Sequence, residues 1–216
     1  MALGKCVLGT NFASQNSSLP MQQIATKKLY TLDEYFALET ALVETKHEFF
    51  NGEIFAMAGA HPNHNTLCVN LIREIGNELI KKGRPCRVFN SDQRVRAAQP
   101  SASRVGYFYP DVSIVCGKPE FSNDNPPTLL NPTVIIEVLS DSTREYDFGK
   151  KLDYYRAIES VQEIVFVSFD KVSASLFRRQ NDAWILRDVR TLEQPLRIES
   201  LELSIPMTEL YRDVVF

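Results

Sequence analysis

The segment Thr133–Leu139, TVIIEVL, constrains the fold more than any other stretch of the chain. Apart from one acidic residue it is apolar or β-branched, which predicts a strand covered on both faces of a sheet. Glu137 stands in the middle of this run, where an isolated ionised carboxylate is costly to bury. A cation close to Glu137 would offset that cost.

Helix signals occur both before and after this strand in the sequence. Thr31–Glu34 forms a capping box before an apolar pattern, which predicts a helix over 31–44. Apolar residues at helical spacing predict a second helix over 65–81, ended by Gly83. A third helix is expected at about 145–159. The helices and strands together predict a single α+β domain of the three-layer α/β type, a mixed sheet flanked by helices.

Strand signals fill the rest of the chain. Asn51-Gly52 between two short apolar runs is a strong hairpin signal. The sequence predicts one or two strands in PCRVFNSDQRVRAA, and one each in YFYPDVSIVCG and EIVFVSF. A β-rich section follows to the end of the chain.

Composition limits the classes of protein to consider. The 216 residues are 44% hydrophobic and 24% charged, which is typical of a globular protein, and no apolar run is long enough to span a bilayer. We interpret residues 1–28 as a poorly ordered polar tail rather than a signal peptide, and 29–216 as the domain. Cys6, Cys68, Cys86 and Cys116 show no close-paired spacing, so we expect free thiols in a reducing cytoplasm.

The charge distribution is uneven. The net charge is −3, yet residues 81–104 contain seven basic residues and a single acid, Asp92. A local basic patch is what contact with phosphates requires, and Arg87, Arg94 and Arg96 are the candidates for nucleic-acid binding. The alternative is a solvated hairpin face with no ligand.

Asp111 and Glu137 form a candidate pair of carboxylates. Asp111 begins the apolar strand DVSIV and Glu137 lies within VIIEVL, so pairing of the two strands would bring the side chains to one edge. Two like charges in a partly dry site repel unless a cation neutralises them. Mg²⁺ uses oxygen ligands and commonly takes one or two carboxylates with water, and Mn²⁺ is a further candidate.

A lysine on the following helix completes this set. At 100° per residue, Lys151 lies beside the apolar stripe of Phe148 and Leu152, whereas Lys150 points to the solvated side. Lys151 can therefore reach the sheet, and Asp147, four residues earlier, can orient it.

Two carboxylates, a divalent metal and a lysine can hydrolyse a phosphodiester. The metal activates water and the lysine stabilises the developing charge. The alternative is purely structural: Asp111 caps a turn, Glu137 pairs with Lys151, and no metal binds.

Three stretches resemble the Uma2 family, also called DUF820, of proposed restriction endonucleases: YPDVSIVC, PTVIIEVLSDSTREYDFGKKLDYYRAI and HEFFNGEIFAMAGAHPNHN. The resemblance covers about residues 30–215, and the family is similar to the PD-(D/E)xK nuclease superfamily. It implies a restriction-endonuclease-like fold in which Asp111 and Glu137 are catalytic metal ligands. Leu139 occupies the usual lysine position, so the resemblance implies that Lys151 has taken the lysine's role. Glu48 matches a further position at which the family could bind metal.

Two histidines allow more than one interpretation. His64 matches the family's HN at the start of a helix and is a supporting site residue, or else a core histidine. His61 and His64 could form a zinc pair, but no third ligand supports that hypothesis.

The resulting hypothesis is a cytoplasmic, Mg²⁺-dependent endonuclease that hydrolyses DNA by metal-activated water. RNA stays open as a substrate, a two-fold homodimer is the expectation for an enzyme that cuts two strands, and no membrane partner is expected. The alternative is a catalytically silent, nuclease-like module that binds nucleic acid or a partner protein.

Overall fold

The computed structural model describes residues 28–42, 44–57, 59–99, 104–139 and 147–216. Its largest element is a six-stranded sheet in the order β10-β9-β8-β7-β6-β3. The strands are β3 (Cys86–Asn90), β6 (Val112–Cys116), β7 (Val134–Leu139), β8 (Glu163–Ser168), β9 (Ala174–Gln180) and β10 (Ala183–Val189). Only the β7–β8 pair is parallel among these neighbours, so the sheet is mixed.

A smaller sheet and a hairpin complete the β-structure. The four-stranded sheet has the order β2-β1-β5-β4, with β1 (His47–Phe50), β2 (Glu53–Ala56), β4 (Val95–Gln99) and β5 (Arg104–Phe108). The hairpin consists of β11 (Pro195–Ile198) and β12 (Leu203–Pro206), joined by the 3₁₀ turn η2 (Glu199–Leu201). Asn51 and Gly52 both have positive φ between β1 and β2, as a tight hairpin turn requires.

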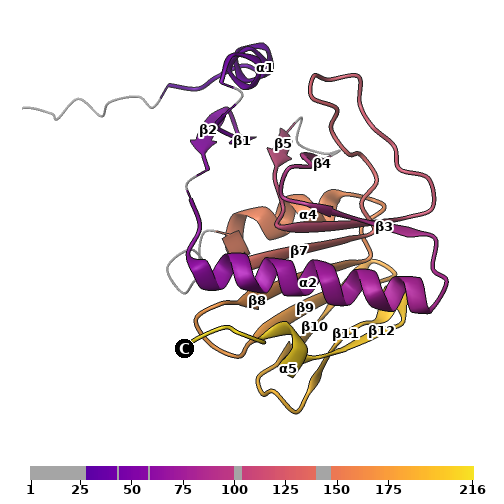
Figure 1. Ribbon diagram of the computed structural model, residues 1–216. Coiled ribbons are helices and arrows are strands. Elements are labelled where there is room, and N and C mark those ends of the chain that lie inside the picture. Colours follow the sequence, from indigo (N-terminus) through magenta and orange to yellow (C-terminus); the bar gives the residue numbers. More distant parts are fainter. Residues whose placement is uncertain (1–27, 43, 58, 100–103, 140–146) are drawn as a thin grey trace, which may run out of the picture.

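The helices cover the two faces of the large sheet. Figure 1 shows α2 (Pro62–Lys81) across one face and α4 (Leu152–Ala157) on the other, with α1 (Leu32–Ala41) beside the small sheet. The π-helical turn η1 (Asp147–Lys151) leads directly into α4, and α5 (Met207–Leu210) lies near the end of the chain. This arrangement gives β7 a helix-bearing layer on each side.

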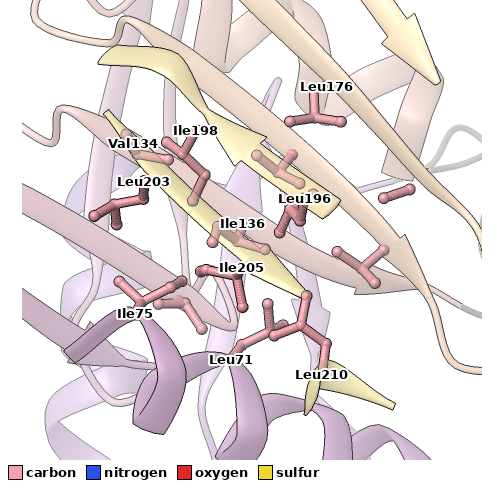
Figure 2. Packing of buried hydrophobic residues seen from close by; sticks show 14 of the residues in the cluster. Leu71, Ile75, Val134, Ile136, Leu176, Leu196, Ile198, Leu203, Ile205 and Leu210 are labelled. Carbon is pink, nitrogen blue, oxygen red and sulfur yellow. The ribbon is translucent and has the colours of Figure 1, made fainter. Parts of the chain in front are cut away.

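Side chains of β7 alternate between two hydrophobic cores. Val134, Ile136 and Val138 belong to the core under α2, which Figure 2 shows together with residues of β11, β12 and α5. Ile135 and Leu139 belong to the core under α4, which also contains residues of the small sheet. Strand alternation therefore places Glu137 on the α4 side, between two buried apolar neighbours.

The expected fold class is confirmed. The capping box of α1 forms between Thr31 and Glu34, α2 ends just before Gly83 with φ of 61°, and β7 is buried along its whole length. Segment YFYPDVSIVCG forms parts of two strands, β5 and β6, because Pro110 has no amide hydrogen to donate to a ladder. The helix expected over 145–159 is shorter, and its described first turn is a π-helical turn.

The prediction of free thiols is wrong for two of the cysteines. Cys86 and Cys116 form a disulfide, since β3 pairs antiparallel with β6 and places these two residues directly opposite each other. Cys68 is a free cysteine. The argument from free thiols to a reducing compartment therefore loses much of its support.

The predicted tail, 1–28, lies almost entirely outside the described residues. Among the described helices none combines the length and apolar character that a membrane crossing requires. The longest, α2, carries charged residues on its exposed face and packs its buried face against the sheet.

Candidate active site

Asp111 and Glu137 lie next to each other across neighbouring strands. Strands β6 and β7 are antiparallel, and Val112 pairs with Ile136, so the next step of the register sets Asp111 opposite Glu137. The Asp111 Oδ2 atom accepts a hydrogen bond of 2.7 Å from the Val138 amide, which fixes this carboxylate at the edge of β7. The Asp111 carboxylate therefore reaches the backbone of β7 one residue beyond Glu137.

The Lys151 side chain reaches Glu137 from the helical layer that contains η1 and α4. Its Nζ atom lies 3.2 Å from Glu137 Oε1 and 2.8 Å from Glu48 Oε1. All three side chains are at most 8% exposed, so these contacts are largely shielded from water. Lys151 ends the π-helical turn, and its inward direction agrees with the helical-wheel argument although that argument assumed an α-helix.

Glu48 enters the site from the small sheet. It is the second residue of β1, next to His47 and before the hairpin turn. Its Oε1 atom accepts a hydrogen bond of 3.2 Å from the backbone amide of Tyr109, two residues before Asp111. The connection between β5 and β6 thus holds two of the three carboxylates together.

Tyr155 is a site residue that the sequence did not predict. Its hydroxyl donates a hydrogen bond of 2.6 Å to Glu137 Oε1, the same oxygen that contacts Lys151. The side chain is fully buried. A buried tyrosine hydroxyl normally finds a polar partner, and its spacing of one helical turn from Lys151 was the signal that could have found it.

His64 and Cys68 border Asp111 from the start of α2. His64 Nε2 lies 3.2 Å from Asp111 Oδ1, and His64 Nδ1 lies 3.6 Å from the Cys68 sulfur. Burial lowers the pKa of His64, but the hydrogen bond and charge of Asp111, helped by Glu137, leave that pKa raised above its ordinary value. The site thus favours an imidazolium beside Asp111.

Cys68 was expected only to be a free thiol. Burial raises its pKa, and the charges of Asp111 and Glu137 raise it further. The thiol is therefore protonated in the absence of a cation. Its position one turn after His64 on the same helix face was visible in the sequence, but its nearness to Asp111 depends on tertiary packing.

We define the acidic cluster as Asp111, Glu137, Glu48 and Lys151. Within the described part of the chain it contains three carboxylates and one ammonium. Glu48 and Glu137 share the Lys151 ammonium, whereas Asp111 contacts His64, which adds at most one further positive charge. Like charges in a partly dry site repel, and a divalent cation would offset this repulsion. Oxygen donors of this kind suit Mg²⁺ or Mn²⁺.

Two predictions concern side chains of the segment around the π-helical turn η1. Asp147 begins the π-helical turn, but its side chain and that of Lys150 lie outside the described part of the chain. The orienting pair of Asp147 with Lys151, and the contrast of Lys151 with Lys150, therefore stay predictions.

The basic segment divides into exposed and internal residues. Arg87 on β3 and Arg96 on β4 are exposed, as contact with a nucleic acid requires. Arg94 is only 1% exposed and points inward, where it donates to Thr128 Oγ1 and to the carbonyl of Pro126. We therefore remove Arg94 from the predicted nucleic-acid contacts. Arg84 pairs with Glu202 and Lys81 with Glu78, which leaves fewer cations for a ligand than the sequence indicated.

His61 does not join His64 as a zinc pair. It is the N-cap of α2, where its Nδ1 atom accepts from the Asn63 amide at 3.2 Å. Its ring stacks on Phe169 with centroids 5.3 Å apart. The residue that shares the vicinity of Asp111 with His64 is Cys68.

Comparison with known proteins decides the family. The model of Uma2, described as "Putative restriction endonuclease", matches residues 32–209. The chain belongs to the Uma2 family. Two Synechocystis sp. proteins described as uncharacterized, sll1609 and slr1290, are 34% and 30% identical over 170 and 185 residues. These matches cover 78% and 85% of this chain, and 92% of each relative.

A solved structure shares the fold of this Uma2 protein. It is a crystal structure described as "a putative nuclease belonging to DUF820" from Anabaena variabilis. The TM-score is 0.63 at 18% identity, and the match covers 86% of this chain and 99% of that one. At this identity the likeness establishes the fold, and the chemistry of the present site has to be argued from its own residues.

Proposed function

We propose that this Uma2 protein is a Mg²⁺-dependent endonuclease that hydrolyses DNA phosphodiester bonds by metal-activated water. The observation that carries the proposal is the acidic cluster, in which Glu48 and Glu137 contact Lys151 and Asp111 bonds to the amide that follows Glu137. A DNA substrate also agrees with a location in the cytoplasm. The family description supports nuclease chemistry in general, and the metal, the substrate and the mechanism are our own assignment.

The donor set fits a hard divalent cation. Asp111 and Glu137 would hold the ion, with Glu48 as a third candidate ligand, and all three supply oxygen atoms. A bound Mg²⁺ or Mn²⁺ would polarise a phosphoryl oxygen and lower the pKa of a bound water. The negative excess of the acidic cluster is what such an ion would neutralise.

The protein's own residues have separate tasks in this proposal. Lys151, shielded from water, places a positive charge where charge develops on the phosphoryl group. Tyr155 fixes the position of Glu137 through its hydrogen bond to Oε1. His64 and the Val138 amide hold the two oxygens of Asp111.

Exposed cations provide a route for binding the phosphate backbone. Arg87 and Arg96 are our candidates for these contacts, which are independent of sequence. A two-fold dimer would allow both strands of a duplex to be cut, and RNA remains to be tested beside DNA.

One observation favours a catalytically silent nuclease-like module instead. Leu139, at the position where the wider superfamily has its lysine, is 4% exposed and packed in the core under α4. The site therefore depends entirely on Lys151 from a different element. If Lys151 serves only to neutralise Glu137 and Glu48, the fold binds nucleic acid or a partner protein without cleaving it.

The two functions differ in a cleavage assay. Wild type is incubated with supercoiled plasmid, single-stranded DNA and RNA in Mg²⁺ or Mn²⁺, beside Glu137→Gln. We expect metal-dependent cleavage by wild type and a loss of at least about 100-fold in Glu137→Gln, the size of effect found when one electrostatic group is removed.

Glu163→Gln is the matched control for this assay. Glu163 is a buried glutamate on the neighbouring strand β8, bound by the Glu199 and Ser200 amides rather than by the acidic cluster. It should retain cleavage. Equal activity in wild type and Glu137→Gln would overturn the proposed site, and absence of metal-dependent cleavage by wild type would favour the silent module.

A further inference from the structure

The group of His64, Cys68 and Asp111 differs chemically from the acidic cluster beside it. Each residue offers one ligand atom, and these atoms all lie within 4.8 Å of one another. The acidic cluster offers oxygen only, whereas this group offers a nitrogen, a sulfur and an oxygen. Mg²⁺ has little use for nitrogen and sulfur donors, but zinc binds cysteine, histidine and aspartate together.

We propose that His64, Cys68 and Asp111 form a second metal site, which takes a borderline divalent cation such as Zn²⁺ or Co²⁺. Three protein ligands with water at the fourth position is the arrangement of an open zinc site. The inference rests on the proposed function only in that Asp111 would be shared with the Mg²⁺ site.

The geometry is close to what a tetrahedral ion needs. Bonds of about 2.0–2.3 Å place neighbouring ligand atoms roughly 3.3–3.8 Å apart. The observed separations are 3.2 Å between His64 Nε2 and Asp111 Oδ1, and 3.6 Å between His64 Nδ1 and the Cys68 sulfur. An ion can use only one imidazole nitrogen. Because the ligand atoms all lie within 4.8 Å of one another, binding requires them to move closer by at most about an ångström.

The surroundings position these ligands. His64 and Cys68 are one turn apart on α2, so they share one helix face and approach from one side. Asp111 arrives from the sheet, held by the Val138 amide at Oδ2, which leaves Oδ1 directed at His64. The Phe169 ring lies against His64 with centroids 6.0 Å apart and limits the ring's freedom.

Metal binding at this site is a simple ligand exchange. The Cys68 S–H bond and the His64 Nε2–H bond break and both protons pass to solvent, while the sulfur, the Nε2 nitrogen and the Asp111 oxygen form bonds to the ion. The ion keeps its oxidation state. Asp111 would be a ligand in both metal sites and cannot bind both ions well at once. Zn²⁺ should therefore compete with Mg²⁺ and inhibit the proposed cleavage.

Cobalt(II) is the probe, because a cobalt–thiolate bond produces a charge-transfer absorption band in the near ultraviolet. Co²⁺ is added to the full chain without thiol reductants, so that the Cys86–Cys116 disulfide stays closed. Wild type should show the band, Zn²⁺ should abolish it by displacement, and Cys68→Ser should lack it. His64→Ala should weaken Co²⁺ binding at least about 100-fold, since even residues behind the ligands cost 10–100-fold.

Cys6→Ser is the control, since Cys6 is the remaining cysteine outside the disulfide. It should keep the band. No band in wild type, or an unchanged band in Cys68→Ser, would overturn the second site and show that the three residues form only a hydrogen-bonded cluster.

A cleavage assay separates this inference from the proposed function. Zinc-free protein that cleaves DNA with Mg²⁺ but gives no cobalt band would retain the proposed function and lose the second site. A cobalt band without any cleavage would support the second site and contradict the proposed function. In an active protein, inhibition by Zn²⁺ should need at least about 100-fold more metal in Cys68→Ser than in wild type. Equal inhibition of the two proteins would refute the sharing of Asp111.

Discussion

The protein buries two clusters of charged residues that resemble each other in composition but differ in charge balance. In the acidic cluster, Glu48 and Glu137 contact Lys151, and the third carboxylate, Asp111, is bonded to the Val138 amide. The second, which we call the Arg94 cluster, consists of Glu39, His47, Tyr109 and Arg94. In it a single carboxylate contacts the His47 ring and amide, the Tyr109 hydroxyl and the Arg94 guanidinium.

The Arg94 cluster is satisfied by its own members and nearby protein groups. Arg94 also bonds to Thr128 and to the Pro126 carbonyl, so the cation has acceptors besides Glu39. Counted over the described residues, the acidic cluster instead has more carboxylates than cations. Burial and ion pairing are common to both, so they do not identify a functional site by themselves. The unbalanced charge is the feature that points to a ligand.

Removal of the guanidinium from the Arg94 cluster should have the largest effect on stability. Arg94→Met leaves Glu39 without its guanidinium, and loss of one partner of a buried pair costs about 3–5 kcal/mol. Arg96 lies two residues after Arg94, on β4, and is exposed, so Arg96→Met should stay within about 0.5 kcal/mol of wild type. Urea unfolding of the two variants measures the difference. Equal stability would mean that the Arg94 cluster contributes little to the fold.

Removal of the Tyr155 hydroxyl should have a smaller effect, confined to the acidic cluster. Tyr155→Phe deletes a hydrogen bond to a charged acceptor, worth about 1.5–3 kcal/mol, which corresponds to a loss of about 10- to 150-fold in kcat/KM. Tyr154→Phe is the matched control, since its hydroxyl donates to Asn51 on the hairpin turn. Cleavage kinetics with Mg²⁺ should separate the two, and similar losses would contradict a positioning role for Tyr155.

The exposed arginines should give the smallest effect. If Arg87 and Arg96 contact phosphates, Arg87→Ala and Arg96→Ala each weaken DNA binding and lower the slope of log affinity against log salt by about 1. Arg187→Ala on β10, whose side chain lies 3.6 Å from Glu199, serves as the control. Binding measured at several salt concentrations tests this, and unchanged slopes would exclude both residues from the DNA contact.

The sequence predicted those parts of the site that depend on local pattern. The β-branched run around Glu137 specified a buried strand, and the apolar stripe beside Lys151 specified its inward direction. The meeting of Asp111 with Glu137 followed once the two strands were assumed to be neighbours, which the β6–β7 pairing shows.

Other parts depend on tertiary contacts that no local pattern encodes. The pairing of Cys86 with Cys116 is set by the register of β3 on β6, across 30 residues of sequence. Arg94 is a charged residue but is buried, because Glu39, Thr128 and Pro126 from distant segments provide acceptors for its guanidinium. The π-helical turn before α4 departs from the α-helical spacing on which the prediction rested.

Metal binding measured by thermal unfolding tests the central claim most directly. A ligand that binds the folded state raises its stability with concentration, so Mg²⁺ or Mn²⁺ should raise the unfolding temperature of wild type progressively. The same titration should leave Glu137→Gln unmoved, while Glu163→Gln responds like wild type. An unchanged midpoint in wild type, or an equal rise in Glu137→Gln, would contradict the claim that the excess carboxylates hold a divalent cation.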